Sequence, residues 1–534
     1  MKSKYRHICL LSLLAVLSVG CRNSKDIVIL YDNDVHCAVD GYAKMAALKA
    51  EMQKATPYVA TVSVGDYVQG GNWGSISKGE YIVRLMNQVG YDVVTLGNHE
   101  YDFGPRQLAR NTADLNARKV CCNYVDLRSR QALYPPYAVM RFGRRKVAFV
   151  GIATPYTFTA SASSLYRDSA TGAPLYDFCL DSLYSVVQRN IDAARRDGAD
   201  YVVLLSHMGT DSIEEPVNSQ TLIAHISGAD VVLDGHEHAV RQFDRMVDKT
   251  GRRVPLSRTG YHFENIGRLT IGRRGDIDME LIPTETYPHA DSATLVLMDS
   301  IRKEFDVVGH RPICRNETDY YVRDQRGEWT TRHCEHGLGK LYTDALRVML
   351  STDIAMTNGG GIRDKLPAGA VTYSDLLSVF PFGNEVYTGT ITGADLLDEL
   401  EYSVWSMPVN FGSFMQVSGL RFEVDTTVAS PVEFDKNMVF VRVRPDSRRR
   451  VSHVEVLDPE TDTYRPLDPE ATYTIASTRY CVVDHGDGNA AMKVADVRNT
   501  KTLELDLLEQ YIDKVLHGTI PESYNTEGER IIVR

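Results

Sequence analysis

The stretch TLGNHEYDFG, residues 95–104, places four side chains that bind metals or carry protons within five consecutive positions. They are Asn98, His99, Glu100 and Asp102, and they directly follow an apolar run. A single polar residue after a strand usually forms a turn, because asparagine and aspartate favour turns. Four such groups together indicate a site for metal binding or proton transfer, so we expect partners for them elsewhere in the chain.

The first 240 residues repeat one arrangement, in which a β-branched apolar run ends on a side chain of a metal-binding type. The runs are DIVILYDNDVH, YVATVSVGD, DVVTLGNHE, DYVVLLSH and DVVLDGHEH. Their terminal groups are Asp34 and His36, Asp66, Asn98 and His99, His207, and His236 and His238. Continuous apolar runs predict strands that are buried on both faces, with helices between them. Sites in such sheets lie beyond the carboxyl ends of the strands, so the sequence predicts a metal site at that edge.

The kinds of side chain also indicate the kind of metal. Aspartate, histidine and asparagine without cysteine suit a divalent ion such as Zn²⁺, Mn²⁺, Co²⁺ or Fe²⁺. One tetrahedral ion would leave several of these donors unused, whereas two ions that share a bridging carboxylate would use them all. Asp66 stands alone in its turn, VGDYVQGG, and is the predicted bridge. We therefore expect two divalent metal ions.

Length and composition indicate a folded protein of more than one domain. The 534 residues are too many for one ordinary core, and 43% of them are hydrophobic. A net charge of −11 argues against a nucleic acid polymer as a partner, since such binders usually carry a basic face. The sequence leaves the oligomeric state open.

The first residues have the pattern of an export signal. Basic residues precede an apolar run over residues 8–19, which is too short to cross a bilayer, and Gly20-Cys21 follows. The ending LSVGC resembles a bacterial lipoprotein signal, in which the cysteine is lipidated. We therefore expect a signal peptide at 1–21 and an exported protein, periplasmic or on the outer surface, with a lipid anchor to the membrane at Cys21.

The motifs DNDVH, VGDYVQGG, GNHEYD, LLSHMG and DGHEH, in this order, resemble those of the binuclear calcineurin-like metallophosphoesterases, specifically their secreted 5′-nucleotidase branch. The resemblance implies an α/β fold: a four-layer α/β/β/α metallophosphoesterase sandwich at 25–290, a connecting helix and linker at 291–331, and a C-terminal α+β nucleotide-binding domain at 332–534. It also implies a ligand set for each metal. One ion would be bound by Asp34, His36, Asp66 and His238, and the other by Asp66, Asn98, His207 and His236.

By the same resemblance, His99 lies beside the metals without binding them. It would donate a proton or hydrogen bond to a phosphoryl or leaving-group oxygen, while a hydroxide held by the two metals attacks phosphorus. Asp102, three residues further on, would orient the imidazole ring and favour its charged form. We expect Glu100 to be structural.

The C-terminal part carries further motifs of the same branch, NGGGIR and PFGN. By resemblance, Asn358, Arg363 and Phe382 would bind the nucleotide, and Asp487 would bind its ribose. The family's second base-stacking aromatic falls on Cys481, where Tyr480 is the neighbouring candidate to replace it. Arg332 is a further candidate for the phosphate side.

These features predict an enzyme that hydrolyses phosphate esters of nucleotides, as a 5′-nucleotidase that could also act on nucleotide pyrophosphates or UDP-sugars. One alternative keeps the fold and changes the substrate: a 2′,3′-cyclic-nucleotide phosphodiesterase with 3′-nucleotidase activity. A second alternative is a non-catalytic nucleotide-binding surface protein.

Overall fold

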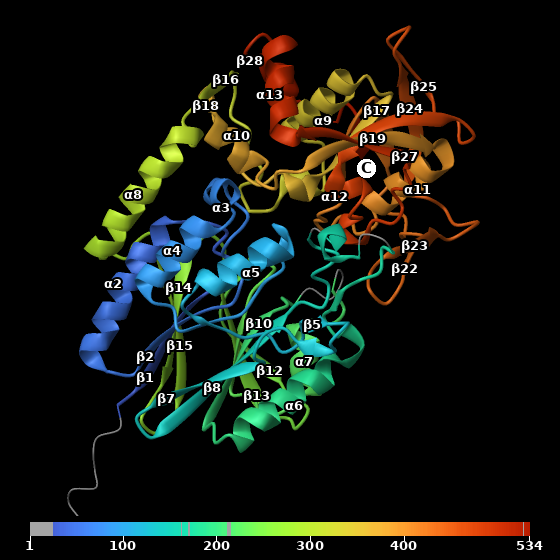
Figure 1. Ribbon diagram of the computed structural model, residues 1–534. Helices are drawn as coiled ribbons and strands as arrows, with labels where there is room; N and C mark the ends of the chain where they lie inside the picture. The colour runs from blue at the N-terminus through green and yellow to red at the C-terminus, as the bar shows by residue number, and fades with distance from the viewer. Residues whose placement is uncertain (1–24, 162, 169–170, 211–214, 527) are drawn as a thin grey trace, which may run out of the picture.

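The structure is a computed structural model that describes residues 25–161, 163–168, 171–210, 215–526 and 528–534. The predicted signal peptide and its Cys21 lie outside the described residues. Figure 1 shows an N-terminal half, in blue to green, below a C-terminal half in yellow to red. Within the described ranges, no helix combines the length and the apolar character that crossing a membrane requires.

The N-terminal half is built on two six-stranded sheets. The first has the order β15-β14-β1-β2-β3-β4, and the second has the order β12-β13-β11-β10-β8-β7. In the first sheet the strands are β1 (Ile27–Asp32), β2 (Val59–Ser63), β3 (Val93–Val94), β4 (Arg118–Lys119), β14 (Asn265–Ile271) and β15 (Ile277–Pro283). In the second they are β7 (Tyr137–Phe142), β8 (Arg145–Ala153), β10 (Tyr201–His207), β11 (Val231–Asp234), β12 (Val240–Val247) and β13 (Arg253–Thr259).

The two sheets pack face to face, and helices cover their outer faces (Figure 1). Side chains of both sheets, such as Ile29, Val62, Phe149 and Leu205, share one buried cluster. The helices of this half are α2 (Asp40–Ala55), α3 (Asn72–Ser77), α4 (Glu80–Val89), α5 (Gly104–Asp114), α6 (Leu183–Arg196), α7 (Ser219–His225) and α8 (Ser292–Gly309). Helices α2, α4 and α8 pack on the first sheet, and α6 and α7 pack on the second. The predicted four-layer order is therefore confirmed.

Parallel pairing brings the predicted ligand-bearing strand ends to one edge. β1, β2 and β3 pair in parallel, as do β10 and β11. These strands are apolar at nearly every position because one face meets helices and the other meets the second sheet. Helix α4 shows how the sequence specifies the outer layers: Ile82, Leu85, Met86 and Val89 lie on its buried face, and Gly90 ends it in the left-handed conformation.

The C-terminal half combines five helices with a five-stranded sheet of order β20-β17-β26-β19-β27 and smaller sheets. Its helices are α9 (Gly337–Leu350), α10 (Tyr373–Val379), α11 (Gly393–Ser403), α12 (Arg479–Val482) and α13 (Glu504–Lys514). The main sheet consists of β17 (Ile354–Asn358), β19 (Glu385–Thr392), β20 (Met415–Ser418), β26 (Thr472–Thr478) and β27 (Ala495–Leu503). A four-stranded sheet contains β21 (Leu420–Val424), β24 (Val451–Asp458), β25 (Thr463–Pro466) and β29 (Ile531–Val533). β22 (Val432–Phe434) and β23 (Phe440–Val443) form a separate hairpin.

Helix α8 runs along the side of the molecule from one half to the other (Figure 1). The strand that follows it, β16 (Pro312–Asn316), pairs with β18 (Gly369–Thr372) and β28 (Thr519–Ile520). These strand pairs therefore join part of the stretch expected to be a linker to the C-terminal half. The domain boundaries themselves stay a prediction.

Candidate functional site

The seven predicted metal ligands lie at the ends of the central strands of both sheets. Asp34 and His36 follow β1, Asp66 follows β2, and Asn98 follows β3, while His207 ends β10 and His236 and His238 follow β11. Five of the seven have a positive φ: Asp34, His36, Asp66, His236 and His238. Positive φ is uncommon in non-glycine residues and often marks a functional site. The turns are therefore shaped to point these side chains inward at some cost in backbone energy.

A first group of possible ligand atoms comprises Asp34, His36 and His238, whose ligand atoms lie within 4.8 Å of one another. His36 Nε2 is 3.0 Å from His238 Nε2 and 3.8 Å from Asp34 Oδ1. His36 Nδ1 lies 2.7 Å from the carbonyl oxygen of Gln69, so Nδ1 carries the proton. The lone pair of Nε2 therefore points at the other two side chains.

A second group comprises Asp66, His207 and His236, again within 4.8 Å. His207 Nε2 lies 3.1 Å from Asp66 Oδ2, and Asn98 Oδ1 lies 2.9 Å from His236 Nδ1. Asp66 Oδ2 is also 3.6 Å from His36 Nε2 of the first group. Asp66 thus lies between the two groups, as its predicted bridging role requires.

The surroundings of His207 test whether these residues fit a metal ion. Its Nδ1 donates to the carbonyl oxygen of Val64 at 2.7 Å, while its buried Nε2 lies 3.1 Å from Asp66 Oδ2 without the alignment of a hydrogen bond. Burial lowers the pKa of His207, but the carboxylates of Asp66 and Asp34 raise it to about 10. A buried nitrogen that two carboxylates would otherwise hold protonated is well suited to a cation in place of that proton. The side chains present therefore fit a divalent metal.

His99 lies next to these two groups of possible ligand atoms. Its Nδ1 is 2.7 Å from Asp102 Oδ2, and its backbone N–H donates to Asp66 Oδ1 at 2.8 Å. Burial acts to lower the pKa of His99, but the nearby carboxylates of Asp102 and Asp66 raise it above the ordinary value. His99, Asp66 and His36 also form a third cluster within 4.8 Å, so geometry alone leaves His99 within reach of an ion.

Glu100 supports the loop that carries Asp66. Its buried carboxylate accepts hydrogen bonds from the backbone N–H groups of Asp66 at 2.8 Å, Tyr67 at 2.8 Å and Gly97 at 2.6 Å. Gly97 must be glycine here, because a Cβ atom would collide with the carboxylate of Asp66. These contacts agree with the structural role expected for Glu100.

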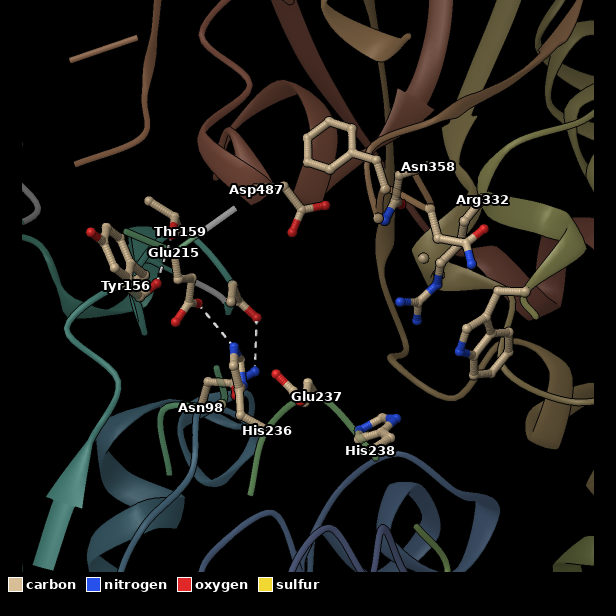
Figure 2. Close-up of a pocket in the computed structure, with 18 of the residues that line it drawn as sticks. Asn98, Tyr156, Thr159, Glu215, His236, Glu237, His238, Arg332, Asn358 and Asp487 are labelled. Atoms are coloured by element: carbon tan, nitrogen blue, oxygen red, sulfur yellow. Dashed lines mark hydrogen bonds and ion pairs between the residues drawn. The ribbon is translucent and has the colours of Figure 1, made fainter. Parts of the chain in front are cut away.

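Glu215 is a contact residue that the sequence analysis missed. Its Oε1 lies 2.9 Å from His236 Nε2, as Figure 2 shows, and its Oε2 accepts a hydrogen bond from Thr154 Oγ1 at 2.7 Å. The other ring nitrogen of His236 faces Asn98. Both ring nitrogens of His236 therefore have a partner: Nδ1 faces Asn98 Oδ1, and Nε2 faces the carboxylate of Glu215.

A cavity of about 700 Å³ extends from these groups to the C-terminal half. All the predicted substrate residues line it: Arg332, Asn358, Arg363, Phe382, Tyr480 and Asp487. From the N-terminal half it is lined by His99, Asp102, Asn98, His236 and His238, among others. Figure 2 shows His236 and His238 below, with Asn358, Arg332 and Asp487 above them.

Arg363 and Phe382 of the C-terminal half face the predicted metal ligands. Phe382 lies against His99, with ring centroids 5.7 Å apart and planes at 28°. The guanidinium group of Arg363 is 5.7 Å from the centre of Phe382. Arg363 is buried, and its Nε and Nη2 have no hydrogen-bond partner among the described residues. Buried donors of this kind suit a phosphate group, which accepts several hydrogen bonds from one arginine.

Family models match two parts of the chain. Residues 314–494 match the family described as 5′-nucleotidase, C-terminal domain. Residues 67–254, which include Asn98, His207 and His236, match the family described as bacterial capsule synthesis protein PGA_cap.

Full-length relatives and a solved structure are also similar. The chain is 27% identical to an apyrase of Aedes aegypti, over 89% of this chain and 83% of the apyrase. It is 24% identical to a 5′-nucleotidase of Rattus norvegicus, over 95% of this chain and 91% of that protein. The crystal structure of a 5′-nucleotidase precursor from Thermus thermophilus matches with a TM-score of 0.78 at 24% identity, over 95% of this chain and 99% of that chain. This likeness confirms the predicted fold class.

Proposed function

Because the chain belongs to the 5′-nucleotidase branch of the metallophosphoesterases, we propose that it hydrolyses phosphate esters of nucleotides, with nucleoside 5′-monophosphates as its central substrates. One observation carries this proposal above the others. A single cavity is lined both by predicted metal ligands of the N-terminal half and by Arg332, Arg363 and Phe382 of the C-terminal half. Such a cavity can bind a phosphate group and an aromatic base at the same time.

Two divalent ions would be bound by the residue sets given by the resemblance. Asp34, His36, Asp66 and His238 would hold one ion, and Asp66, Asn98, His207 and His236 would hold the other. Once bound, the ions would neutralise charge on the phosphoryl oxygens and lower the pKa of the attacking water. The donor set fits ions of the Zn, Mn or Co class, and this choice of metals is part of the same proposal.

His99 would act on the substrate directly. Asp102 accepts from Nδ1 and so leaves Nε2–H free to donate to a phosphoryl or leaving-group oxygen. Burial alone would lower the pKa of His99 and favour neutral imidazole, so the carboxylates of Asp102 and Asp66 keep a proton available on the ring. Asp102 thus orients the ring and helps to maintain its charge.

The C-terminal side chains would position the nucleotide. Arg363 and Arg332 would bind phosphate oxygens, and Phe382 would stack on the base. Asp487 would accept hydrogen bonds from the ribose hydroxyls, because its carboxylate lines the cavity. Holding the substrate at several points places phosphorus beside the ions and His99.

Glu215 would support the metal site through its contact with His236. A histidine that binds a metal through one nitrogen usually donates its other N–H to a carboxylate or carbonyl group. Glu215 Oε1 stands at that position relative to His236 Nε2, at 2.9 Å. We therefore propose that Glu215 fixes the ring orientation of His236.

A substrate panel tests the proposed function. Protein reconstituted with Zn²⁺, Mn²⁺ or Co²⁺ would be assayed for phosphate release from AMP, UMP, ADP, UDP-glucose, 3′-AMP and 2′,3′-cyclic AMP. We expect release from AMP and UMP that chelation abolishes and added metal restores. Turnover of cyclic and 3′-nucleotides without 5′-nucleotides would favour the phosphodiesterase alternative, and AMP binding without any turnover would favour a non-catalytic binding protein.

Export and anchoring are separate parts of the proposal. Cys21 would carry a lipid that tethers the protein on the periplasmic or outer surface. Expression of wild type and Cys21→Ala, followed by separation of membrane and soluble fractions, tests this. Wild type should sediment with membranes, whereas Cys21→Ala should not.

A further inference from the structure

The family's second base-stacking position carries no ring in this protein and does not reach the cavity. Cys481 occupies it, is 1% exposed, and packs in the core among apolar side chains. Its Sγ lies 3.7 Å from Asn358 Oδ1, behind the cavity wall. A base in the cavity would therefore find no partner at Cys481.

The neighbouring Tyr480 is engaged elsewhere. Its hydroxyl donates to Asp487 Oδ1 at 3.0 Å, and Gly486 packs so closely on its ring that a Cβ atom there would collide with it. One ring face is thus covered by backbone, and the hydroxyl supports the proposed ribose-binding carboxylate. Tyr480 is suited to holding Asp487 in place and not to stacking on a base.

Three aromatic rings from other elements line the same cavity: Trp405, Phe411 and Phe434. Trp405 and Phe411 meet edge to face, with centroids 5.6 Å apart and planes at 79°. Trp405 and Phe434 meet at 4.7 Å and 63°. These three rings, here called the aromatic wall, form angular corners in which a planar ring can stack on one face and meet the edge of another.

The aromatic wall adjoins the residues proposed to bind the nucleoside. Gly412, next to Phe411, passes so close to Asp487 that a Cβ atom would lie 2.8 Å from Oδ2. Ser413 Oγ donates to the same oxygen at 3.0 Å. The carbonyl oxygen of Gly412 accepts from the backbone N–H of Gly360, in the loop between Asn358 and Arg363, at 2.8 Å. A ribose held by Asp487 would therefore project its base near Phe411 and Trp405.

We propose that the aromatic wall, chiefly Trp405 and Phe411, is the base-binding surface that replaces the family's missing aromatic at Cys481. The proposal rests on the proposed nucleotide-hydrolase function and names the part of the site that recognises the base. An aromatic ring can stack on the face of any base. The aromatic wall would therefore bind purine and pyrimidine nucleotides and favour the larger purine ring.

The test compares a nucleotide with the same phosphate ester lacking the base. KM is measured for AMP and for ribose 5-phosphate in wild type, Trp405→Leu, Phe411→Leu and Phe440→Leu. Phe440 is the matched control, because it packs in the same core cluster as Phe411 but does not line the cavity. Thermal unfolding of each variant shows that it is folded.

We expect Trp405→Leu and Phe411→Leu to raise KM for AMP by roughly 5- to 150-fold, the range that base–aromatic stacking corresponds to. KM for ribose 5-phosphate should change by less than about twofold, and Phe440→Leu should leave both values unchanged. Equal losses for both substrates, or normal AMP binding in both wall variants, would overturn the proposal. Equilibrium dialysis of AMP with the same proteins after chelation of the metals gives the comparison without turnover, so failure of the base site and failure of catalysis are distinguished.

Discussion

His99 Nδ1 and Asp102 Oδ2 lie 2.7 Å apart on one short turn that follows β3. The His99 ring also stacks near Phe382 of the C-terminal half, with ring centroids 5.7 Å apart. The histidine thereby contacts a carboxylate of one half and an aromatic ring of the other. A proton donor held in this way can be tested apart from the metal ligands.

His99→Asn should lower kcat by roughly 10²–10⁴, which is the usual contribution of a positioned proton donor or acceptor. Both metal ions should remain bound, because His99 is proposed to act beside them. Steady-state kinetics with AMP and metal analysis by mass spectrometry measure the two effects together. Loss of one ion in this variant would show that His99 is a ligand, as the third cluster of possible ligand atoms allows.

Asp66→Asn should lower the metal content below about two ions per chain and abolish turnover. Asp66 Oδ2 is the atom that faces both groups, at 3.6 Å from His36 Nε2 and 3.1 Å from His207 Nε2. An amide supplies no bridging charge between two cations. Asp40→Asn, at an exposed residue paired with Arg302, is the control. Two tightly bound ions with normal activity in Asp66→Asn would contradict the binuclear assignment.

Glu215→Ala should weaken the binding of one ion by about 10- to 100-fold, the typical effect of removing a carboxylate that orients a ligating histidine. Glu215→Gln keeps an acceptor for His236 Nε2–H and should lose less. Thr154→Val serves as the matched control, because it removes the hydrogen bond to the other carboxylate oxygen, together with a longer bond from the backbone N–H of Tyr156, and leaves the contact with His236 in place. Titration of metal-free protein with Zn²⁺ in competition with a chelating dye measures the affinity directly. Unchanged affinity in Glu215→Ala would mean that the carboxylate does not support the site.

The strand-end ligands could be predicted because their signal is local. Each of them lies within a few residues of an apolar run, and parallel pairing then brings the strand ends to one edge. The sequence signals for the helices are equally local, as the apolar face of α4 and the glycine at its C-terminal end show. The fold class and the outline of the metal site thus followed from periodicity and motif order.

Glu215 and the aromatic wall could not be predicted in the same way. Glu215 lies in the polar stretch DSIEEPVN, where nothing in the sequence separates it from its acidic neighbour Glu214. Its contact with His236 is a product of the tertiary fold. Trp405 and Phe411 lie more than 70 residues from Asp487, and aromatic residues at such positions are usually core. Only the cavity that both residues line distinguishes them from ordinary core aromatic residues.

Glu399 provides a test of electrostatics away from the site. Its side chain is fully buried on α11, its Oε1 accepts from Asn489 Nδ2 at 2.8 Å, and its Oε2 has no hydrogen-bond partner among the described residues. Burial raises the pKa of Glu399 from 4.5 to about 8. Between pH 4.5 and about 8, Glu399 stays protonated in the folded protein but is ionised in the unfolded protein. The stability that protonated Glu399 allows is therefore fully present below pH 4.5 and is lost as the pH rises to about 8.

Glu399→Gln should therefore become progressively more stable relative to wild type as the pH is raised from 5 to 8, by up to about 1.4 kcal/mol for each pH unit. Glutamine has nearly the same shape and keeps the acceptor for Asn489, but it carries no charge at any of these pH values. Urea unfolding of both proteins at pH 5, 6.5 and 8 measures the difference, and exposed Glu470→Gln controls for the general loss of one negative charge. A stability difference that stays constant across this range would show that Glu399 is already ionised in the folded protein at pH 5, and hence that its carboxylate is better solvated than its burial indicates.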